Sequence, residues 1–170
     1  ERIIFAEIRA PRVVLAAIVG ASLASSGAAL QGVFRNPLGD PGLIGVSGGA
    51  ALGAATAIFL GSAFNFSGWP VLYSIPLAAI LGASFVTFFL YKFTSYLGHF
   101  SIITVLLVGI AINAFSTVGI MGFQYLSDDA QLRSLVFWLM GSFARAEWET
   151  VIPAACIILS AVIMLCRQTR

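Results

Sequence analysis

Charged side chains are scarce in this chain of 170 residues. They make up 9% of the sequence, against 59% hydrophobic residues, whereas about a quarter of the residues in soluble domains are charged. The few charges also cluster, and none lies between Arg12 and Arg35, between Asp40 and Lys92, or between Lys92 and Asp128. Because charge is costly inside a bilayer, this spacing excludes an ordinary soluble domain and indicates a membrane protein.

Groups that catalyse reactions or bind metals are scarce too. Neither Cys156 nor Cys166 belongs to a CxxC motif, and His99 has no Cys, Asp or Glu at ligand spacing. We expect two buried structural thiols and a histidine in a surface loop, with a disulfide, a metal ligand or a proton relay as weaker alternatives. HExxH and Gly-Lys-Ser/Thr motifs are absent. We therefore predict no catalytic residue, no metal site, no cofactor and no enzymatic activity.

Long apolar runs predict an all-α polytopic transmembrane bundle. One crossing needs about 20 mostly apolar residues, and these runs lack the in-and-out alternation of a β-barrel. We expect five spans, near 13–33, 42–61, 70–91, 102–126 and 149–166. The first run leads into further spans without a cleavage site, so it is not a signal peptide. Because the chain begins at Glu1 and not at Met, we expect a fragment.

A shorter amphipathic helix is predicted at 127–141. Its start signal is Ser127-Asp128-Asp129. Apolar residues then recur at helical spacing, at Leu132, Leu135, Val136, Leu139 and Met140. About three or four turns are too short to cross a bilayer. We expect this helix to lie at the membrane surface or to re-enter the bilayer.

The link between the first two spans is a polar turn at 35–42. Asp40 can cap the next helix, and Pro41 suits a first helical turn. Beyond it, Gly45, Gly49 and Gly53 recur every four residues, and Ala57 and Gly61 continue the repeat. Such a stripe allows another helix to pack closely, and a direct substrate role is the weaker alternative.

Five polar residues fall at membrane depth. We expect them to bond to neighbouring helices, and the lining of a wet pathway is the alternative. They are Ser22, Ser25, Ser26, Gln31 and Asn113.

The basic residues are scattered singly, which predicts no nucleic-acid partner. If the spans alternate, four basic residues lie on one side and five on the other, so charge does not orient the bundle.

Four motifs resemble those of FecCD-type permeases, the transmembrane subunits of ATP-binding-cassette importers for iron chelates, haem and vitamin B12. They are IRAPR at 8–12, SGAALQ at 26–31, RNPLGDPGLIGVSGGA at 35–50 and FWLMGSF at 137–143. The resemblance implies a subunit of ten spans, of which residues 1–170 would form a partial permease domain, the second to sixth spans.

The resemblance also implies partners and a mechanism. The permease would pair with itself or a close homologue in the lipid of a bacterial cytoplasmic membrane. Separate cytoplasmic ATPase subunits would hydrolyse ATP, and an extracytoplasmic binding protein would deliver an iron chelate, haem or a ferric siderophore, for alternating access. The vitamin B12 type of importer remains an alternative, and a passive channel component or a membrane-embedded enzyme are further ones.

Site residues follow from the same resemblance. Arg9 and Arg12 would contact glutamates of the binding protein on the outer side, and anchoring in lipid headgroups is the alternative. On the cytoplasmic side, Asn36 and Leu38 of the turn and the isoleucines 102 and 103 would form a gate. Some relatives carry small hydroxyl residues in place of the isoleucines, and contacts of Ile102 and Ile103 with lipid or a neighbouring helix are the alternative.

Overall fold

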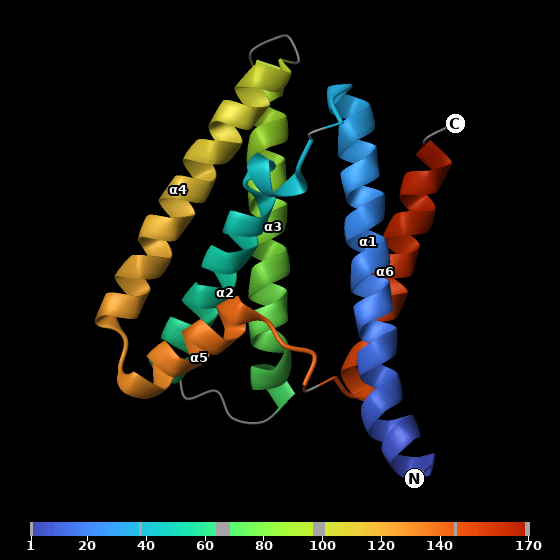
Figure 1. Cartoon of the computed structure of the whole chain (residues 1–170). Coiled ribbons are helices and arrows are strands. Elements are labelled where there is room, and N and C mark those ends of the chain that lie inside the picture. The colour runs from blue at the N-terminus through green and yellow to red at the C-terminus, as the bar shows by residue number, and fades with distance from the viewer. Residues whose placement is uncertain (1, 38, 64–68, 97–100, 145, 169–170) are drawn as a thin grey trace. The chain divides into compact units, whose positions relative to one another are not determined.

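The computed structural model describes residues 2–37, 39–63, 69–96, 101–144 and 146–168. Within these ranges the chain is helical and contains no strand, which confirms the all-α prediction (Figure 1). The elements are a π-helix η1 (Ile4–Arg9), α1 (Ala10–Phe34), a 3-10 turn η2 (Pro41–Ile44), α2 (Val46–Ala63), α3 (Trp69–Tyr96), α4 (Ile102–Leu126), α5 (Asp129–Met140) and α6 (Trp148–Gln168).

Four described helices are long and apolar enough to cross a membrane: Ile4–Phe34, Tyr73–Tyr96, Ile102–Leu126 and Trp148–Arg167. The fifth, α2, is apolar over Val46–Gly61 and is shorter. Its predicted start at residue 42 is wrong. Gly45 has a φ of 86°, a left-handed conformation, and separates η2 from α2. Glycine adopts this conformation without the steric cost that a Cβ brings.

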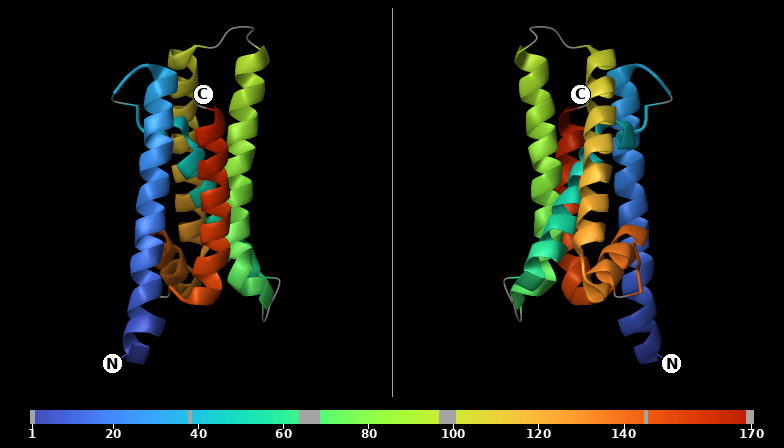
Figure 2. Two further views of the ribbon diagram at one scale, coloured as in Figure 1. Left: turned by 90° about the vertical axis from the view of Figure 1, so that its right-hand side faces the viewer. Right: turned by 90° about the vertical axis from the view of Figure 1, so that its left-hand side faces the viewer.

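The helices form two compact units. The first comprises residues 1–37 and 141–170, and the second comprises residues 38–140. In the first unit, α1 and α6 lie side by side (Figures 1 and 2). In the second unit, α2 packs along α3 and also contacts α4, η2 and α5.

Glycines bring the backbones of α2 and α3 into contact. A Cβ atom added to Gly49 would lie 2.9 Å from the carbonyl oxygen of Gly82 and would also overlap Val86. A Cβ on Gly82 would in turn overlap the carbonyl oxygen of Gly49. A Cβ on Gly53 would likewise overlap the carbonyl of Ala78. The predicted packing role of the stripe is therefore confirmed at Gly49 and Gly53, whereas a Cβ on Gly61 would meet no described atom within 4 Å.

Contact with α4 also relies on glycine. A Cβ on Gly109 would overlap the carbonyl of Leu43, in η2, and a Cβ on Gly48 would overlap the Asn113 side chain. Asn113 donates a hydrogen bond from Nδ2 to the Gly42 carbonyl at 2.8 Å. Asn113 was expected to bond to a neighbouring helix, and its partner lies in the short 3-10 element η2.

The three serines of α1 behave differently. Each hydroxyl donates to a carbonyl of its own helix: Ser22 to Val19, Ser25 to Ala21 and Ser26 to Leu23. The prediction of bonds to a neighbouring helix is therefore wrong for them. A serine hydroxyl reaches the carbonyl one turn back without any partner helix.

A capping box begins α5. Asp128 Oδ1 accepts hydrogen bonds from the backbone N–H groups of Ala130 (3.0 Å) and Gln131 (2.8 Å), and Gln131 Oε1 accepts from Asp128 N–H at 3.2 Å. Leu135, with 1% of its surface exposed, is the buried residue of this helix. The predicted short helix and its start signal are confirmed.

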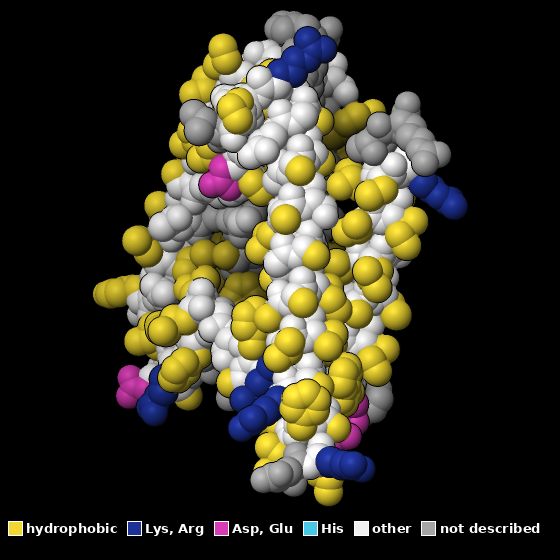
Figure 3. Space-filling model, turned by 45° about the vertical axis from the view of Figure 1, so that its right-hand side comes forward, with side chains coloured by type: hydrophobic (Ala, Val, Ile, Leu, Met, Phe, Trp, Pro, Cys, Tyr) yellow, Lys and Arg dark blue, Asp and Glu magenta, His cyan; other side chains and the backbone are white. Residues whose placement is uncertain are grey.

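Both cysteines of α6 are exposed, so the prediction of buried thiols is wrong. The helix contacts α1, and its other faces expose large apolar side chains such as Ile157, Ile163 and Met164. Hydrophobic side chains cover much of the helix surface in Figure 3, and the Lys and Arg side chains lie near helix ends. His99 lies outside the described residues.

Replacing Asn113 by Leu tests the bond between α4 and η2. The Gly42 carbonyl would lose its donor, and we expect a loss of about 1 kcal/mol of stability. A lower midpoint of thermal unfolding of the protein in detergent would show it. The control is Thr117→Val, because the Thr117 hydroxyl bonds to a carbonyl of its own helix. Equal midpoints for the two variants would contradict a role for the Asn113 bond.

Candidate functional site

A Schellman motif ends α1. The N–H of Arg35 donates to the carbonyl of Gly32 (3.3 Å), and the N–H of Asn36 donates to the carbonyl of Gln31 (3.2 Å). Arg35 has a φ of 48° and a ψ of 35°, the left-handed conformation. That conformation costs a residue with a Cβ about 1–2 kcal/mol. Other contacts must therefore hold the turn.

One such contact is the side chain of Gln31. Its Nε2 donates to the Pro37 carbonyl at 2.9 Å, so Gln31 bonds to the turn through both its backbone and its side chain. The expectation that Gln31 bonds to a neighbouring helix is wrong. The side chain instead reaches past the end of its own helix and spans Asn36, a predicted gate residue.

The following turn is held by Asp40. Its Oδ1 accepts a hydrogen bond from the Gly42 N–H at 2.8 Å, and its carbonyl accepts from Leu43 N–H at 3.1 Å. The predicted capping by Asp40 therefore occurs, although the capped element is η2 and not α2. Gly45 then ends η2 where a Cβ would lie 2.9 Å from the Gly109 carbonyl.

The predicted gate residues divide between the two units. Asn36 is exposed on the turn after α1, in the first unit. Ile102 and Ile103 begin α4 in the second unit, after Ser101, whose hydroxyl accepts a hydrogen bond from Thr104 N–H at 3.4 Å. Ile103 is 71% exposed and Ile102 is half-buried. Leu38 lies outside the described residues. The gate stays a prediction.

Both predicted docking arginines are exposed near the start of α1. Arg12 donates from Nη2 to the carbonyl of Ala144 at 2.7 Å. Nearby in the same unit, Trp148 donates from Nε1 to the carbonyl of Ala6 at 3.0 Å. Neither acceptor could be predicted from the sequence, because every residue has a backbone carbonyl and the residue type does not indicate which of them accepts such a bond. Binding-protein docking by Arg9 and Arg12 stays a prediction.

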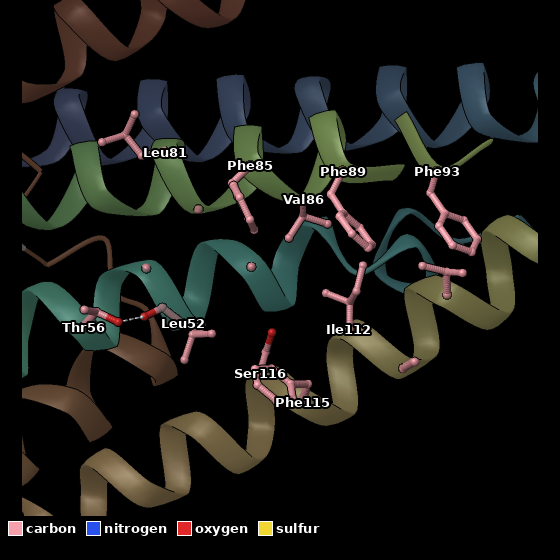
Figure 4. Close-up of a pocket in the computed structure, with 15 residues that line it drawn as sticks. Leu52, Thr56, Leu81, Phe85, Val86, Phe89, Phe93, Ile112, Phe115 and Ser116 are labelled. Carbon is pink, nitrogen blue, oxygen red and sulfur yellow. Dashed lines mark hydrogen bonds between the residues drawn. The ribbon is translucent and has the colours of Figure 1, made fainter. Parts of the chain in front are cut away.

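An apolar cavity of about 820 Å³ lies among α2, α3 and α4 (Figure 4). Phe85, Phe89 and Phe93 line it from α3. Its two polar side chains are Thr56, which donates to the Leu52 carbonyl at 2.7 Å, and Ser116. A charged molecule would find almost no polar partner there, so the cavity suits apolar groups. We therefore place no charged substrate in it.

Residues 45–49 have the letters of a hydrolase nucleophile elbow, GxSxG. Such an elbow needs a strand before the serine and a His as partner. Here Ser47 lies at the start of α2, after a 3-10 turn, and the described residues contain no strand. They also contain no group of three His, Cys, Asp or Glu residues that could hold a metal ion. The motif therefore lacks the setting of a nucleophile elbow. Its glycines, Gly45, Gly48 and Gly49, instead allow close packing against neighbouring segments.

The described geometry is that of an integral membrane bundle with polar turns at its helix ends. The FecCD transport family model matches residues 1–170. The chain belongs to the FecCD transport family.

Individual relatives agree with this membership. The chain is 41% identical over 167 residues to the hemin transport system permease protein HmuU of Yersinia pestis, covering 98% of this chain and 49% of that protein. It is 39% identical over 165 residues to the cobalamin import system permease protein BtuC of Halobacterium salinarum, covering 96% and 42%. The chain thus spans about half the length of these relatives.

A solved structure agrees as well. It is described as an inward-facing conformation of a metal-chelate type ABC transporter. The TM-score is 0.78 at 38% identity, over 89% of this chain and 46% of that one.

Replacing Gln31 by Glu tests the clamp on the turn. The side chain keeps its size, but a carboxylate cannot donate to the Pro37 carbonyl and repels it. We expect faster hydrogen exchange at the Asn36 amide of the protein, by about fivefold for the loss of one hydrogen bond.

The matched control is Gln124→Glu, which adds the same charge near the end of another long helix, α4. Exchange at Asn36 should not change in this variant. Equal acceleration by the two variants would show that added charge, and not the lost donor, is responsible.

Proposed function

We propose that this chain is part of the transmembrane permease of an ATP-driven importer for an iron chelate, haem or a ferric siderophore. The match to the FecCD transport family over the whole chain carries the proposal. The relative from Yersinia pestis, a hemin permease, supports haem among the candidate substrates.

The proposed mechanism is alternating access in a bacterial cytoplasmic membrane. A binding protein delivers the chelate outside, a pair of permeases forms the pathway, and ATPase subunits drive the change between its two open states. The chelate crosses without chemical change. Residues 1–170 would supply the second to sixth of ten spans in each permease.

Uptake into proteoliposomes tests the proposal. The full-length permease would be reconstituted with its ATPase and a binding protein loaded with haem, a ferric siderophore or cobalamin. We expect uptake of haem or the siderophore that requires both ATP and the binding protein.

Two other results would be decisive against the proposal. Uptake of cobalamin alone would favour the alternative that the relative from Halobacterium salinarum represents. Uptake without ATP would favour a passive channel.

We propose further that Arg9 and Arg12 dock the binding protein. Both are exposed, and guanidinium groups bind carboxylates with paired hydrogen bonds. Reversing both to Glu should weaken binding of the loaded binding protein about tenfold or more, mainly through slower association at low salt. The control is Arg133→Glu, at an exposed position of α5. Unchanged affinity after the double reversal would leave headgroup anchoring as the role of these arginines.

The gate proposal concerns Asn36, Leu38, Ile102 and Ile103. A hydrophobic constriction can close a pathway by excluding water. Single cysteines at residues 36, 102 and 103, made after Cys156→Ser and Cys166→Ser, should react with a water-soluble maleimide at different rates with and without ATP. Tyr96→Cys is the control, because Tyr96 is 90% exposed at the end of α3. Identical rates in both states at all three positions would exclude a gate there.

A further inference from the structure

Three phenylalanines of α3 line one side of the apolar cavity in the second unit. Phe85, Phe89 and Phe93 recur every four residues and therefore lie on one face of the helix. Their rings point from α3 toward α4 (Figure 4). A volume of about 820 Å³ is that of a ligand pocket, and the wall is almost wholly hydrocarbon. The cavity therefore suits an apolar chain.

A second hollow, of about 550 Å³, adjoins this cavity near the end of α3. Phe89 and Phe93 line both of them, whereas Lys92, Ser95 and Tyr96 line the second alone. An apolar space thus lies beside a place where an ammonium group and two hydroxyl groups gather.

Lys92 is the charged residue of this arrangement. The helices α2, α3 and α4 contain no other Lys or Arg and no Asp or Glu, so nothing on them neutralises its charge. Its ammonium lies 5.7 Å from the centroid of the Phe88 ring, in a cation–π contact on its own helix. A lysine near the end of a span reaches the lipid headgroups with its ammonium while its methylene groups stay among apolar groups.

We propose that the cavity and the adjoining hollow bind one anionic phospholipid, with an acyl chain in the cavity and the phosphate at Lys92. An occupant of both spaces needs a hydrocarbon chain and a negative charge, and an anionic phospholipid of the surrounding membrane has both. An apolar helix could fill the cavity, but it would leave Lys92 without a negative partner. The site lies within the second unit and is independent of the transported substrate.

Two lipids with identical acyl chains test the role of Lys92. Native mass spectrometry of the protein from detergent would measure binding of phosphatidylglycerol, which is anionic, and of phosphatidylcholine, which is zwitterionic. We expect phosphatidylglycerol to bind about fivefold more tightly, the effect of one basic residue at an anionic headgroup. Lys92→Gln should remove this preference and leave binding of phosphatidylcholine unchanged. The control is Arg133→Gln, at an exposed position of α5, which should keep the preference.

Filling the cavity tests the place of the acyl chain. Ala111 lines the cavity from α4, and Ala111→Phe should weaken binding of both lipids about tenfold or more, because the ring displaces methylene groups of the chain. Ala114→Phe is the control, since Ala114 is exposed on the same helix and is not among the residues that line the cavity. If Ala111→Phe does not fold, Leu81→Trp fills the cavity from α3, where Leu81 is 69% exposed.

Glycerol 3-phosphate tests whether the phosphate alone is bound. It has no acyl chain, so it should not compete with phosphatidylglycerol. Competition at similar concentrations would show that Lys92 binds free phosphate groups, and would overturn the assignment of the site to a lipid.

Three other results would overturn the proposal. Equal affinity of the wild-type protein for the two lipids would exclude recognition of charge. An equal loss of preference in Lys92→Gln and Arg133→Gln would assign the preference to general attraction between the protein and anionic lipid. Unchanged lipid binding after the cavity is filled would show that the acyl chain lies elsewhere and leave a protein segment as the occupant.

Discussion

The close contact of two backbones at Gly49 and Gly82 organises the second unit. In a bilayer the lipid is as apolar as the side chains, so burying them between helices gains little, and van der Waals contact and hydrogen bonds hold helices together. The absence of a side chain at both positions lets α2 lie against α3 with its main chain. On α4, the absence of a side chain at Gly109 likewise lets η2 pack closely. The Asn113 bond to Gly42 then ties α4 to that turn.

Side-chain hydrogen bonds also hold the turns at the ends of α1. The Gln31 clamp and the Asp40 cap hold the turns after α1, and the Arg12 and Trp148 bonds hold its start. Most of these bonds end on backbone carbonyls or N–H groups. They hold the segments on which exposed residues such as Arg9 and Asn36 lie.

Local patterns predicted the helices well. The span at 102–126 agrees with α4 at both ends, because the serines that flank it, Ser101 and Ser127, lie in extended backbone. The start of α2 was misplaced, since hydropathy does not register the left-handed φ of Gly45. The bonds of Arg12 and Trp148 join residues more than 130 positions apart. No sequence pattern indicates a donor so far away in the chain, so neither bond was predicted.

Two alanine substitutions test the backbone contact most directly. Alanine favours a helix over glycine by up to about 1 kcal/mol. Gly122→Ala, where a Cβ meets no described atom within 4 Å, should therefore keep or raise the thermal unfolding midpoint of the protein. Gly82→Ala should lower it despite the same gain, because its Cβ overlaps the Gly49 carbonyl. If both substitutions raise the midpoint equally, the contact of α2 with α3 is not the constraint on which the unit depends.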